Sequence, residues 1–419
     1  MAWLGCKVNQ AESHHLGREL AARGWERPAP GEPAELAVLL TCSVTAAAAR
    51  QSRQMARRLA RAHPGATVVV TGCDAQAEPA AYQAEGFRVL GRSELADLAA
   101  RAARGEWPTE LPGPPDAGSF LPGAWPPGQG RSRGLLKVQD GCDAHCAYCI
   151  VPSTRGRPRS LPLDQALEQW NALAAQGARE VVLTGIHLGR WGRDLTPPRE
   201  LAALVAALLA APGPRLRLSS LEGGEVSPEL WDLARREPRL CRHFHLPLQS
   251  GCDRLLRAMG RPHPTAHFRR TVELLHRELP GVCLGADVMV GLPGEDAAAF
   301  RETRDFLASL PLAYLHVFPY SPRPGTPAAQ RPGRPPGDLV KARAEELRTL
   351  GQGFRERFAA SQVGAVLDLV VEGGGRGRSG NYCLVELPGG PPPGSLARME
   401  ITSWTPQEPA PLLRGRLIP

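Results

Sequence analysis

Three cysteines that lie far apart in the sequence each stand where an apolar run ends. They are Cys6 after residues 3–5, Cys42 after residues 39–41 and Cys73 after residues 70–72. Amphipathic stretches such as 46–62 alternate with these runs, and this alternation predicts a parallel α/β sheet. Parallel strands end at one edge of their sheet, where open α/β sheets bind ligands. We therefore expect the three thiols to meet there, although three separate buried cysteines also fit the pattern.

A second group of cysteines is closely spaced on one short segment. It comprises Cys142, Cys146 and Cys149, and it follows a predicted strand at residues 135–139. Three thiolates leave a cubane iron–sulfur cluster one cysteine short, so that one iron keeps an open position. The alternative is structural zinc with His145 as fourth ligand, but the spacing favours iron and sulfur. The remaining cysteines share neither context; they are Cys241, Cys252, Cys283 and Cys383.

The pattern of apolar runs divides the chain into three folded parts and a linker. Residues 1–106 carry the α/β sheet, and residues 107–133 are crowded with proline and glycine, which is typical of a linker. In residues 134–361, helical stretches separate most of the strand candidates, which predicts a partial (β/α)6 barrel. These candidates are 135–139, 180–184, 215–219, 243–246, 284–290 and 314–318.

The last part, residues 362–419, has the pattern of a small β-barrel. Short strands are expected at 366–371, 382–387 and 397–402, between turns rich in glycine and proline. Arg376 and Arg378 are expected on a glycine-rich loop. Arginines in such a loop pair with phosphates in some proteins and are merely solvated in others.

Composition limits the function classes. Of 419 residues, 42% are hydrophobic, so the chain can build cores and is not wholly disordered. No apolar run reaches about 18 residues, which argues against a membrane span, and the first residues lack the layout of a secretion signal. We therefore expect a cytoplasmic protein with reduced cysteines. The net charge of +8 points weakly to nucleic acid, because the scarcity of lysine beside arginine also suggests a GC-rich genome.

The closely spaced cysteines resemble a known signature. Their spacing, with the aromatic Tyr148 just before the third cysteine, is similar to that of the radical S-adenosylmethionine enzymes. In that family the open iron chelates the amino and carboxylate groups of S-adenosylmethionine. The resemblance implies reductive cleavage of this cofactor to a 5′-deoxyadenosyl radical.

Further segments resemble the methylthiotransferases, a branch of the same family. They are residues 4–12, 41–45, 71–73, 141–152, 155–157, 245–251, 287–295 and 316–326. Residues 362–419 resemble the TRAM domain, the small RNA-binding β-barrel of these enzymes, so the likeness spans nearly the whole chain. Lys7-Val8-Asn9 and residues 183–187 look like the branch that acts on N6-threonylcarbamoyladenosine in tRNA.

The resemblance implies two 4Fe-4S clusters, S-adenosylmethionine and a set of site residues. One cluster, held by Cys142, Cys146 and Cys149, cleaves S-adenosylmethionine. The auxiliary cluster, held by Cys6, Cys42 and Cys73, carries the sulfur that is transferred. The residues expected to contact S-adenosylmethionine are Tyr148, Thr184, Gly185, His245, Gln249, Gly291 and Glu295. Arg376 and Arg378 are expected to hold tRNA, and a flavodoxin or ferredoxin to deliver single electrons.

The implied reaction is addition of a methylthio group to carbon 2 of N6-threonylcarbamoyladenosine next to the anticodon. Breaking that C–H bond is hard for side-chain acids and bases, so a cofactor must do it. Two other readings stay open: methylthiolation of isopentenyladenosine or of a ribosomal protein, and a tRNA-binding protein whose metal is purely structural.

Overall fold

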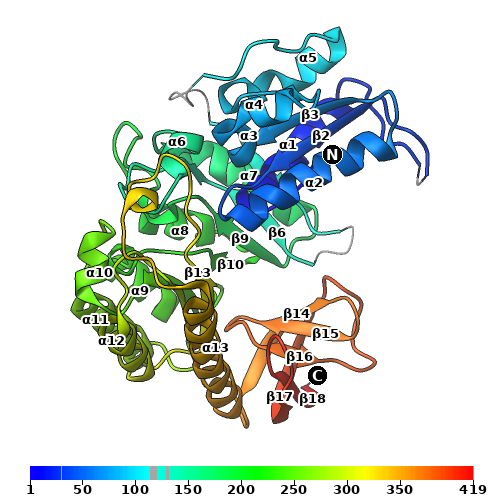
Figure 1. Ribbon diagram of the computed structural model, residues 1–419. Helices are drawn as coiled ribbons and strands as arrows, with labels where there is room; N and C mark the ends of the chain where they lie inside the picture. Colours follow the sequence, from blue (N-terminus) through cyan, green and yellow to red (C-terminus); the bar gives the residue numbers. More distant parts are fainter. Residues whose placement is uncertain (30, 114–119, 129–131, 419) are drawn as a thin grey trace.

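The computed structural model describes residues 1–29, 31–113, 120–128 and 132–418. It confirms the α/β class and the three folded parts in the predicted order (Figure 1). The N-terminal domain lies above the central barrel in that view, and helix α13 (Gly337–Ala360) leads from the barrel to the C-terminal domain. None of the described helices is long and apolar enough to cross a membrane.

Four parallel strands in the order β1-β2-β3-β4 form the N-terminal sheet, and both of its faces are buried. Val38 and Leu40 point to the core under α1, whereas Ala37 and Leu39 point to the core under α2, as the two-residue period of a strand requires. The elements are β1 (Ala2–Trp3), α1 (Lys7–Ala21), β2 (Leu36–Thr41), α2 (Ala46–Ala62), β3 (Thr67–Gly72), α3 (Cys73–Ala77), α4 (Pro79–Gln83), β4 (Arg88–Val89), the 3-10 helix η1 (Arg92–Asp97) and α5 (Leu98–Arg104).

The six predicted strands of the central domain are all present and parallel. They follow one another around a partial barrel as β6 (Gly134–Lys137), β9 (Glu180–Thr184), β10 (Arg215–Leu218), β11 (His243–Gln249), β12 (Cys283–Val290) and β13 (Tyr314–Pro319). Only a single bridge, between Leu216 and Leu240, joins the two halves of the described barrel. The apolar residues of the strands and of the outer helices form one core.

Short elements and outer helices complete the central domain. They are β7 (Gln139–Asp140), α6 (Val151–Arg155), β8 (Arg159–Ser160), α7 (Leu163–Ala175), η2 (Leu188–Arg190), α8 (Leu201–Leu209), η3 (Gly223–Glu225), α9 (Pro228–Arg236), α10 (Asp253–Ala258), α11 (Thr265–Glu278), α12 (Ala297–Ala308) and η4 (Pro327–Gln330). The helices cover the outside of the strands, so the carboxyl ends of the strands stay available for a site.

The predicted linker at residues 107–133 contains a strand that the sequence analysis missed. Strand β5 (Gly123–Trp125) pairs antiparallel with β6 and extends the barrel sheet. Its Trp125 packs edge-on against Trp3 and stacks on His14, so it also contacts the N-terminal domain. A strand of three residues is too short to show a period in the sequence. Residues 114–119 and 129–131 of this segment lie outside the described residues.

The C-terminal domain is a closed barrel in the order β14-β15-β16-β18-β17. Its strands are β14 (Val366–Glu372), β15 (Arg376–Ser379), β16 (Leu384–Glu386), β17 (Leu396–Thr405) and β18 (Leu412–Ile418). Arg376 and Arg378 lie in β15, so their predicted placement on a loop was wrong. The glycine between them points into the barrel, where a Cβ would lie 2.6 Å from Leu387. This glycine, which the packing of the barrel requires, contributes to the loop-like appearance of the sequence here.

Buried ion pairs fix the C-terminal barrel to the central domain. Glu180 is fully buried and pairs with Arg215 at 2.6 Å and Arg217 at 2.7 Å. The same arginines donate to backbone carbonyls across the boundary, at Arg378 (2.6 Å) and Ser379 (2.9 Å). Because these guanidinium groups are shared, removing the C-terminal barrel would leave buried donors unpaired in the central domain.

Candidate functional site

The three dispersed cysteines lie at the carboxyl ends of neighbouring strands. Thr41 pairs with Gly72 in the sheet, and Cys42 and Cys73 directly follow these two residues. On the other side of β2, Leu4 donates its backbone N–H to the carbonyl of Leu40, which brings the Cys6 turn beside Cys42. The sheet thus unites residues that are more than thirty positions apart in the sequence.

Close packing holds these turns together. Gly5 has a φ of +89°, and a Cβ at this position would lie 2.6 Å from the Cys42 sulfur. The Asn9 side chain donates to the carbonyls of Leu4 (2.8 Å) and Thr41 (3.0 Å), so one amide ties the Cys6 turn to the Cys42 turn. Their geometry is therefore set by the protein itself.

The closely spaced cysteines lie on a loop after β7, anchored by backbone contacts. The Cys142 N–H donates to the carbonyl of Gly156. The Ala147 N–H donates to the carbonyl of Met259, and the Ala147 carbonyl accepts from the N–H of Ala328. Two side chains contact the sulfurs: His187 lies 3.2 Å from Cys142 Sγ, and Arg261 donates to Cys146 Sγ at 3.8 Å. Both are held by carboxylates, since His187 pairs with Glu225 and Arg261 with Glu222.

Burial disfavours the thiolate form of two of these cysteines, one in each group. Burial raises the pKa of the Cys42 thiol to about 11 and the pKa of the Cys149 thiol to about 12. Thiolates, not thiols, bind iron, so assembly of a cluster on either group must release protons.

A buried charge network lies between the two groups of cysteines. We define it as Glu12, Arg92, Lys137, Asp140 and Arg155, all of which are less than a tenth exposed. The carboxylate of Glu12 contacts all three cations, Lys137 at 2.6 Å, Arg92 at 2.7 Å and Arg155 at 3.1 Å. Asp140 contacts the same cations at 2.7–3.1 Å. The N-terminal domain and the barrel both contribute, so the network also joins the two domains.

Arg155 extends the buried charge network to an expected cluster ligand. Its Nε donates to the Cys73 sulfur at 3.2 Å, while its two terminal nitrogens contact Asp140 and Asn9 at 2.8 and 2.6 Å. Three cations against two carboxylates leave the network with one excess positive charge. A thiolate bound to iron would offset that charge, so the chemistry of these residues fits an anionic cluster at Cys73.

Removing Glu12 tests the buried charge network. Burial alone would raise the pKa of this carboxyl, but Arg155, Arg92 and Lys137 lower it from about 4.5 to about 2. Glu12→Gln leaves three buried cations with Asp140 as their single carboxylate, and we expect it to lower the free energy of unfolding by roughly 3–5 kcal/mol in urea titrations at pH 7. The control Glu19→Gln breaks only an exposed pair with Arg23 and should change it by less than about 1 kcal/mol.

The pH dependence of the same variant gives a second readout. Because the folded pKa of Glu12 lies below its unfolded value, its stabilisation is complete above about pH 4.5 and is lost as the pH falls toward 2. The wild type should therefore lose stability faster than Glu12→Gln between these values. Parallel acid titration curves for the two proteins would contradict this role for Glu12.

Gln249 has two features that fit a ligand site. It has a positive φ of 75° at the end of β11, where a bulge shifts the register with β12. Its side-chain Oε1 is buried and has no hydrogen-bond partner among the described residues. A strained backbone and an unpaired buried acceptor cost free energy and are typical of functional sites. Gln249 therefore suits a cofactor that donates a hydrogen bond, as S-adenosylmethionine does through its amino groups.

The other residues expected at the cofactor lie at different places around the barrel. Tyr148 packs against a small apolar cluster that includes Met259 and Met289. Thr184 ends β9, with Gly185 next to it against Gln139. The carboxylate of Glu295 is used within the protein, because it accepts from the N–H of Gly291 and pairs with Arg343 at 2.7 Å.

His245 belongs to a histidine cluster inside the barrel rather than to the cysteine loop. Its Nε2 lies 2.8 Å from Asp287, which also contacts His316 at 3.3 Å. Its Nδ1 lies 2.9 Å from the Tyr314 hydroxyl. Tyr314 also contacts His243 at 2.8 Å.

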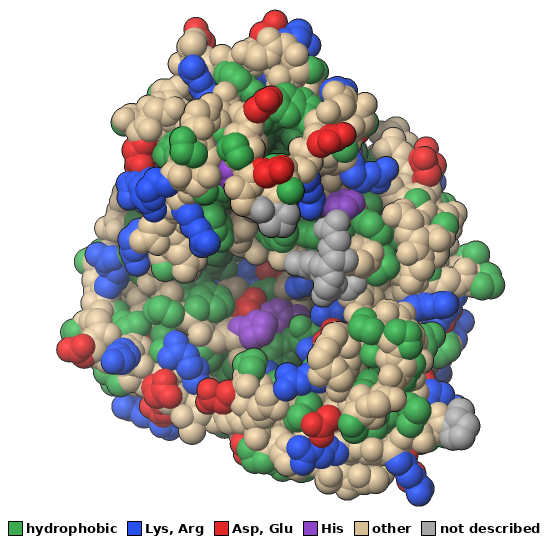
Figure 2. All heavy atoms as spheres, turned by 90° about the vertical axis from the view of Figure 1, so that its right-hand side faces the viewer, with side chains coloured by type: hydrophobic (Ala, Val, Ile, Leu, Met, Phe, Trp, Pro, Cys, Tyr) green, Lys and Arg blue, Asp and Glu red, His purple; other side chains and the backbone are tan. Residues whose placement is uncertain are grey.

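These residues line a cavity between the three domains, which we call the interdomain cavity. It has a volume of about 660 Å³, and its walls come from α1, from the barrel strands and from residues 372–373 and 382 of the C-terminal domain. Figure 2 shows the hollow between the N-terminal domain and the C-terminal barrel, with histidine side chains inside it. Lys7, which directly follows Cys6, lies on its wall.

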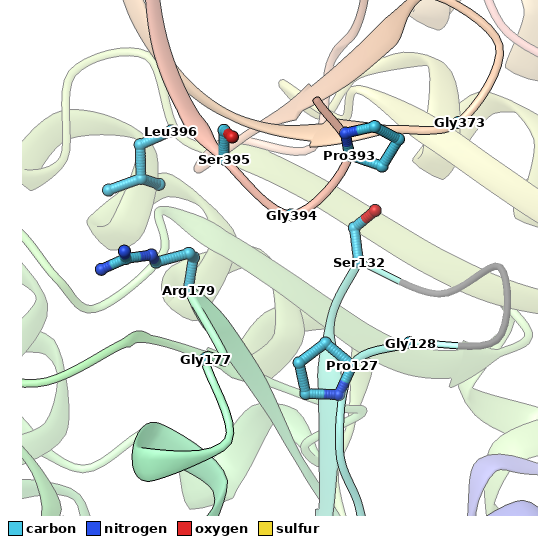
Figure 3. Close-up of a pocket in the computed structure, with 10 residues that line it drawn as sticks. All are labelled: Pro127, Gly128, Ser132, Gly177, Arg179, Gly373, Pro393, Gly394, Ser395 and Leu396. Carbon is cyan, nitrogen blue, oxygen red and sulfur yellow. The ribbon is translucent and has the colours of Figure 1, made fainter. Parts of the chain in front are cut away.

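A second cavity lies on the C-terminal side of the interdomain cavity, and the two share Ser132 and Gly373. It has a volume of about 760 Å³ and opens between the loop at residues 393–396 and the barrel residues Gly177 and Arg179 (Figure 3). None of the cysteines lines it. We therefore assign no chemistry to it.

Sequence reasoning missed several residues that contact the cysteine sulfurs. Arg155 and His187 lay within segments whose resemblance was recognised, but neither was selected as a site residue, and Arg261 was not noticed. The four other cysteines are buried, as in an ordinary core. Of the two arginines of β15, Arg378 pairs with Glu372 at 3.3 Å and stacks over Tyr382. The side chain of Arg376 makes no hydrogen bond or ion pair with the described residues, and only its backbone pairs with the neighbouring strands.

Each of the two groups of cysteines lies in a segment that matches a known protein family. Residues 136–307 match the model of the Radical SAM superfamily, and residues 1–90 match that of the Uncharacterized protein family UPF0004. Among solved structures, the chain resembles the radical S-adenosylmethionine methyltransferase TsrM from Kitasatospora setae. The TM-score is 0.54 at 18% identity, over 77% of this chain and 69% of that one, which shows a shared fold.

Curated relatives match over nearly the full length. The chain is 33% identical to a threonylcarbamoyladenosine tRNA methylthiotransferase MtaB of Rickettsia prowazekii, over 91% of this chain and 90% of the relative. The MtaB of Aquifex aeolicus is also 33% identical, over 95% and 98%. A tRNA-2-methylthio-N(6)-dimethylallyladenosine synthase of Nitratidesulfovibrio vulgaris is 33% identical over 92% and 91%. Because these relatives are enzymes, they argue against the alternative interpretation of the chain as a tRNA-binding protein whose metal is purely structural. The chain belongs to the radical S-adenosylmethionine methylthiotransferases, in the MtaB branch.

Proposed function

We propose that this enzyme adds a methylthio group to carbon 2 of N6-threonylcarbamoyladenosine in tRNA. The names of the two MtaB relatives support this substrate. The observation that carries the proposal is the proximity of the two groups of cysteines, because Arg155 from the segment after one group donates to Cys73 of the other. Such an arrangement suits a reaction that needs a radical source and a sulfur carrier near one substrate.

Each group of cysteines has its own task in this proposal. Cys142, Cys146 and Cys149 hold the cluster that cleaves S-adenosylmethionine, and Cys6, Cys42 and Cys73 hold the auxiliary cluster. When bound, these groups supply the radical that activates the C–H bond and the sulfur that replaces the hydrogen. The protein fixes their surroundings: His187 and Arg261 orient the first set of sulfurs, and Arg155 positions Cys73.

An external one-electron donor completes the proposed chemistry. Reductive cleavage of S-adenosylmethionine consumes an electron that no residue of the chain can supply. A flavodoxin or ferredoxin is the expected class of donor, since both carry single electrons at low potential.

The C-terminal barrel is proposed to hold tRNA, with Arg376 as a phosphate contact. Arg376→Gln should weaken tRNA binding and lower the slope of log K against log salt by about 0.7–0.9, the value for one lost phosphate contact. Fluorescence anisotropy at several salt concentrations measures both quantities. The control Arg23→Gln removes an arginine that is paired with Glu19 on α1 and should leave the slope unchanged. An unaltered slope for Arg376→Gln would remove this residue from the RNA interface.

Nucleoside mass spectrometry on tRNA from a deletion strain tests the proposed function. Loss of 2-methylthio-N6-threonylcarbamoyladenosine, restored by the wild-type gene, is the expected result. Loss of the methylthio form of isopentenyladenosine instead would assign the enzyme to that substrate. If both nucleosides persist, the proposal fails, and a ribosomal protein becomes the substrate to examine.

A further inference from the structure

Among the described residues that line the interdomain cavity, one cation has no counter-ion. Three cationic side chains line it: Lys7, Arg133 and Arg217. Arg217 pairs with the buried Glu180 at 2.7 Å, and Arg133 pairs with Glu372 at 3.3 Å. Lys7 is exposed and lines the cavity, and its side-chain ammonium makes no hydrogen bond or ion pair with any residue in the described part of the chain.

The acidic groups of the interdomain cavity are already engaged. Asp287 contacts His245 and His316, and hydrogen bonds from these two histidines overcome the effect of burial and hold its pKa well below the usual range. Glu372 is shared between Arg133 and Arg378. The described lining of the cavity therefore offers Lys7 no free carboxylate, and an anionic ligand group would supply one.

The position of Lys7 adds to its preference for an anion. It is the first residue of α1, a helix of 15 residues whose first turn contains no acidic side chain. Its N-cap, Cys6, accepts no capping hydrogen bond through its side chain, so no side chain of the first turn offsets the partial positive charge of the helix end. The lysine charge and the helix end thus act on the same part of the cavity.

We propose that Lys7 binds the carboxylate of the threonylcarbamoyl group and thereby selects this nucleoside. The inference rests on the proposed function and deepens it. In the adenine ring, N6 is separated from carbon 2 only by C6 and N1, so the threonyl group lies near the reacting carbon. A base that presents carbon 2 toward the Cys6 turn brings its carboxylate within reach of the next residue. Isopentenyladenosine has no such anion and gains nothing from Lys7.

A charge-removal series on defined RNA tests this assignment. Anticodon stem-loops carrying N6-threonylcarbamoyladenosine, its carboxamide analogue or isopentenyladenosine are offered to the reconstituted wild type, Lys7→Gln and Lys7→Arg. Anisotropy gives Kd, and product formation gives KM. We expect the wild type to bind the carboxylate about 10- to 100-fold more tightly than the carboxamide, as a hydrogen bond between charged groups implies. Lys7→Gln should lose this preference, and Lys7→Arg should keep it.

A control variant shows whether the loss of any positive charge on α1 has the same effect. Arg18→Gln removes one exposed positive charge from the same helix, away from the cavity, and should behave as the wild type does. An equal loss of affinity for carboxylate and carboxamide in Lys7→Gln would assign Lys7 to a phosphate, and an undiminished preference would exclude it from recognition. Either result overturns the inference alone. Wild-type enzyme that methylthiolates only the isopentenyl stem-loop would instead overturn the proposed function.

Discussion

Replacing Cys142, Cys146 and Cys149 together with alanine should abolish cleavage of S-adenosylmethionine and leave roughly half of the iron. Cysteine thiolates anchor a cubane cluster, and alanine cannot take their place. The loop itself should survive, because backbone bonds from Cys142 to Gly156 and from Ala147 to Met259 hold it without the thiols. The measurements are 5′-deoxyadenosine formed under a chemical reductant, and iron and sulfide per chain.

Cys252→Ala is the matched control for this triple variant. Cys252 is 2% exposed and packs against Leu255 and Ala299 in the core, so its loss should change neither iron content nor activity. If the triple variant still forms 5′-deoxyadenosine, these cysteines do not generate the radical. If Cys252→Ala loses iron as well, the assignment of ligands by spacing is wrong.

The fold could be predicted well wherever the signal was local. The apolar runs at residues 36–40 and 67–70 are buried on both sides of a parallel sheet, so they stand out in the sequence, and the six barrel strands do so for the same reason. Strand β5 was not predicted, because three residues are too few to show the two-residue alternation of a strand. Strand β15 was not predicted, because the glycine inside it is typical of a turn.

The candidate site could be predicted only where its residues have a distinctive chemistry. The cysteines were selected as candidates because three of them follow neighbouring strands of one sheet and the other three are closely spaced in the sequence. Arg92, Lys137 and Asp140 were not found, because charged residues usually lie at the surface. They are buried at the contact between the N-terminal domain and the barrel, where Arg92 pairs with Asp140. The sequence of either segment alone therefore does not predict this contact between the domains.

Cys42→Ala should separate the two activities of the enzyme. We expect loss of the auxiliary cluster and of all methylthiolated nucleoside, while cleavage of S-adenosylmethionine continues. The fold should tolerate the change, because the backbone N–H of Cys42 is held by the Ser52 hydroxyl at 3.0 Å, independently of the thiol. Iron analysis, 5′-deoxyadenosine formation and nucleoside mass spectrometry on one preparation measure the split. Cys383→Ala, which removes another buried thiol, is the control and should retain all three.

A second variant disturbs the position of the Cys42 thiol without removing it. Gly5→Ala places a methyl group 2.6 Å from the Cys42 sulfur, at a backbone φ of +89° that alanine rarely adopts. It should displace the thiol and reproduce the phenotype of Cys42→Ala, with radical generation intact and sulfur transfer lost. A purely structural role for Cys42 predicts the opposite pattern, in which misfolding damages both activities together. Loss of 5′-deoxyadenosine formation in both variants would therefore refute an auxiliary cluster at this edge of the sheet.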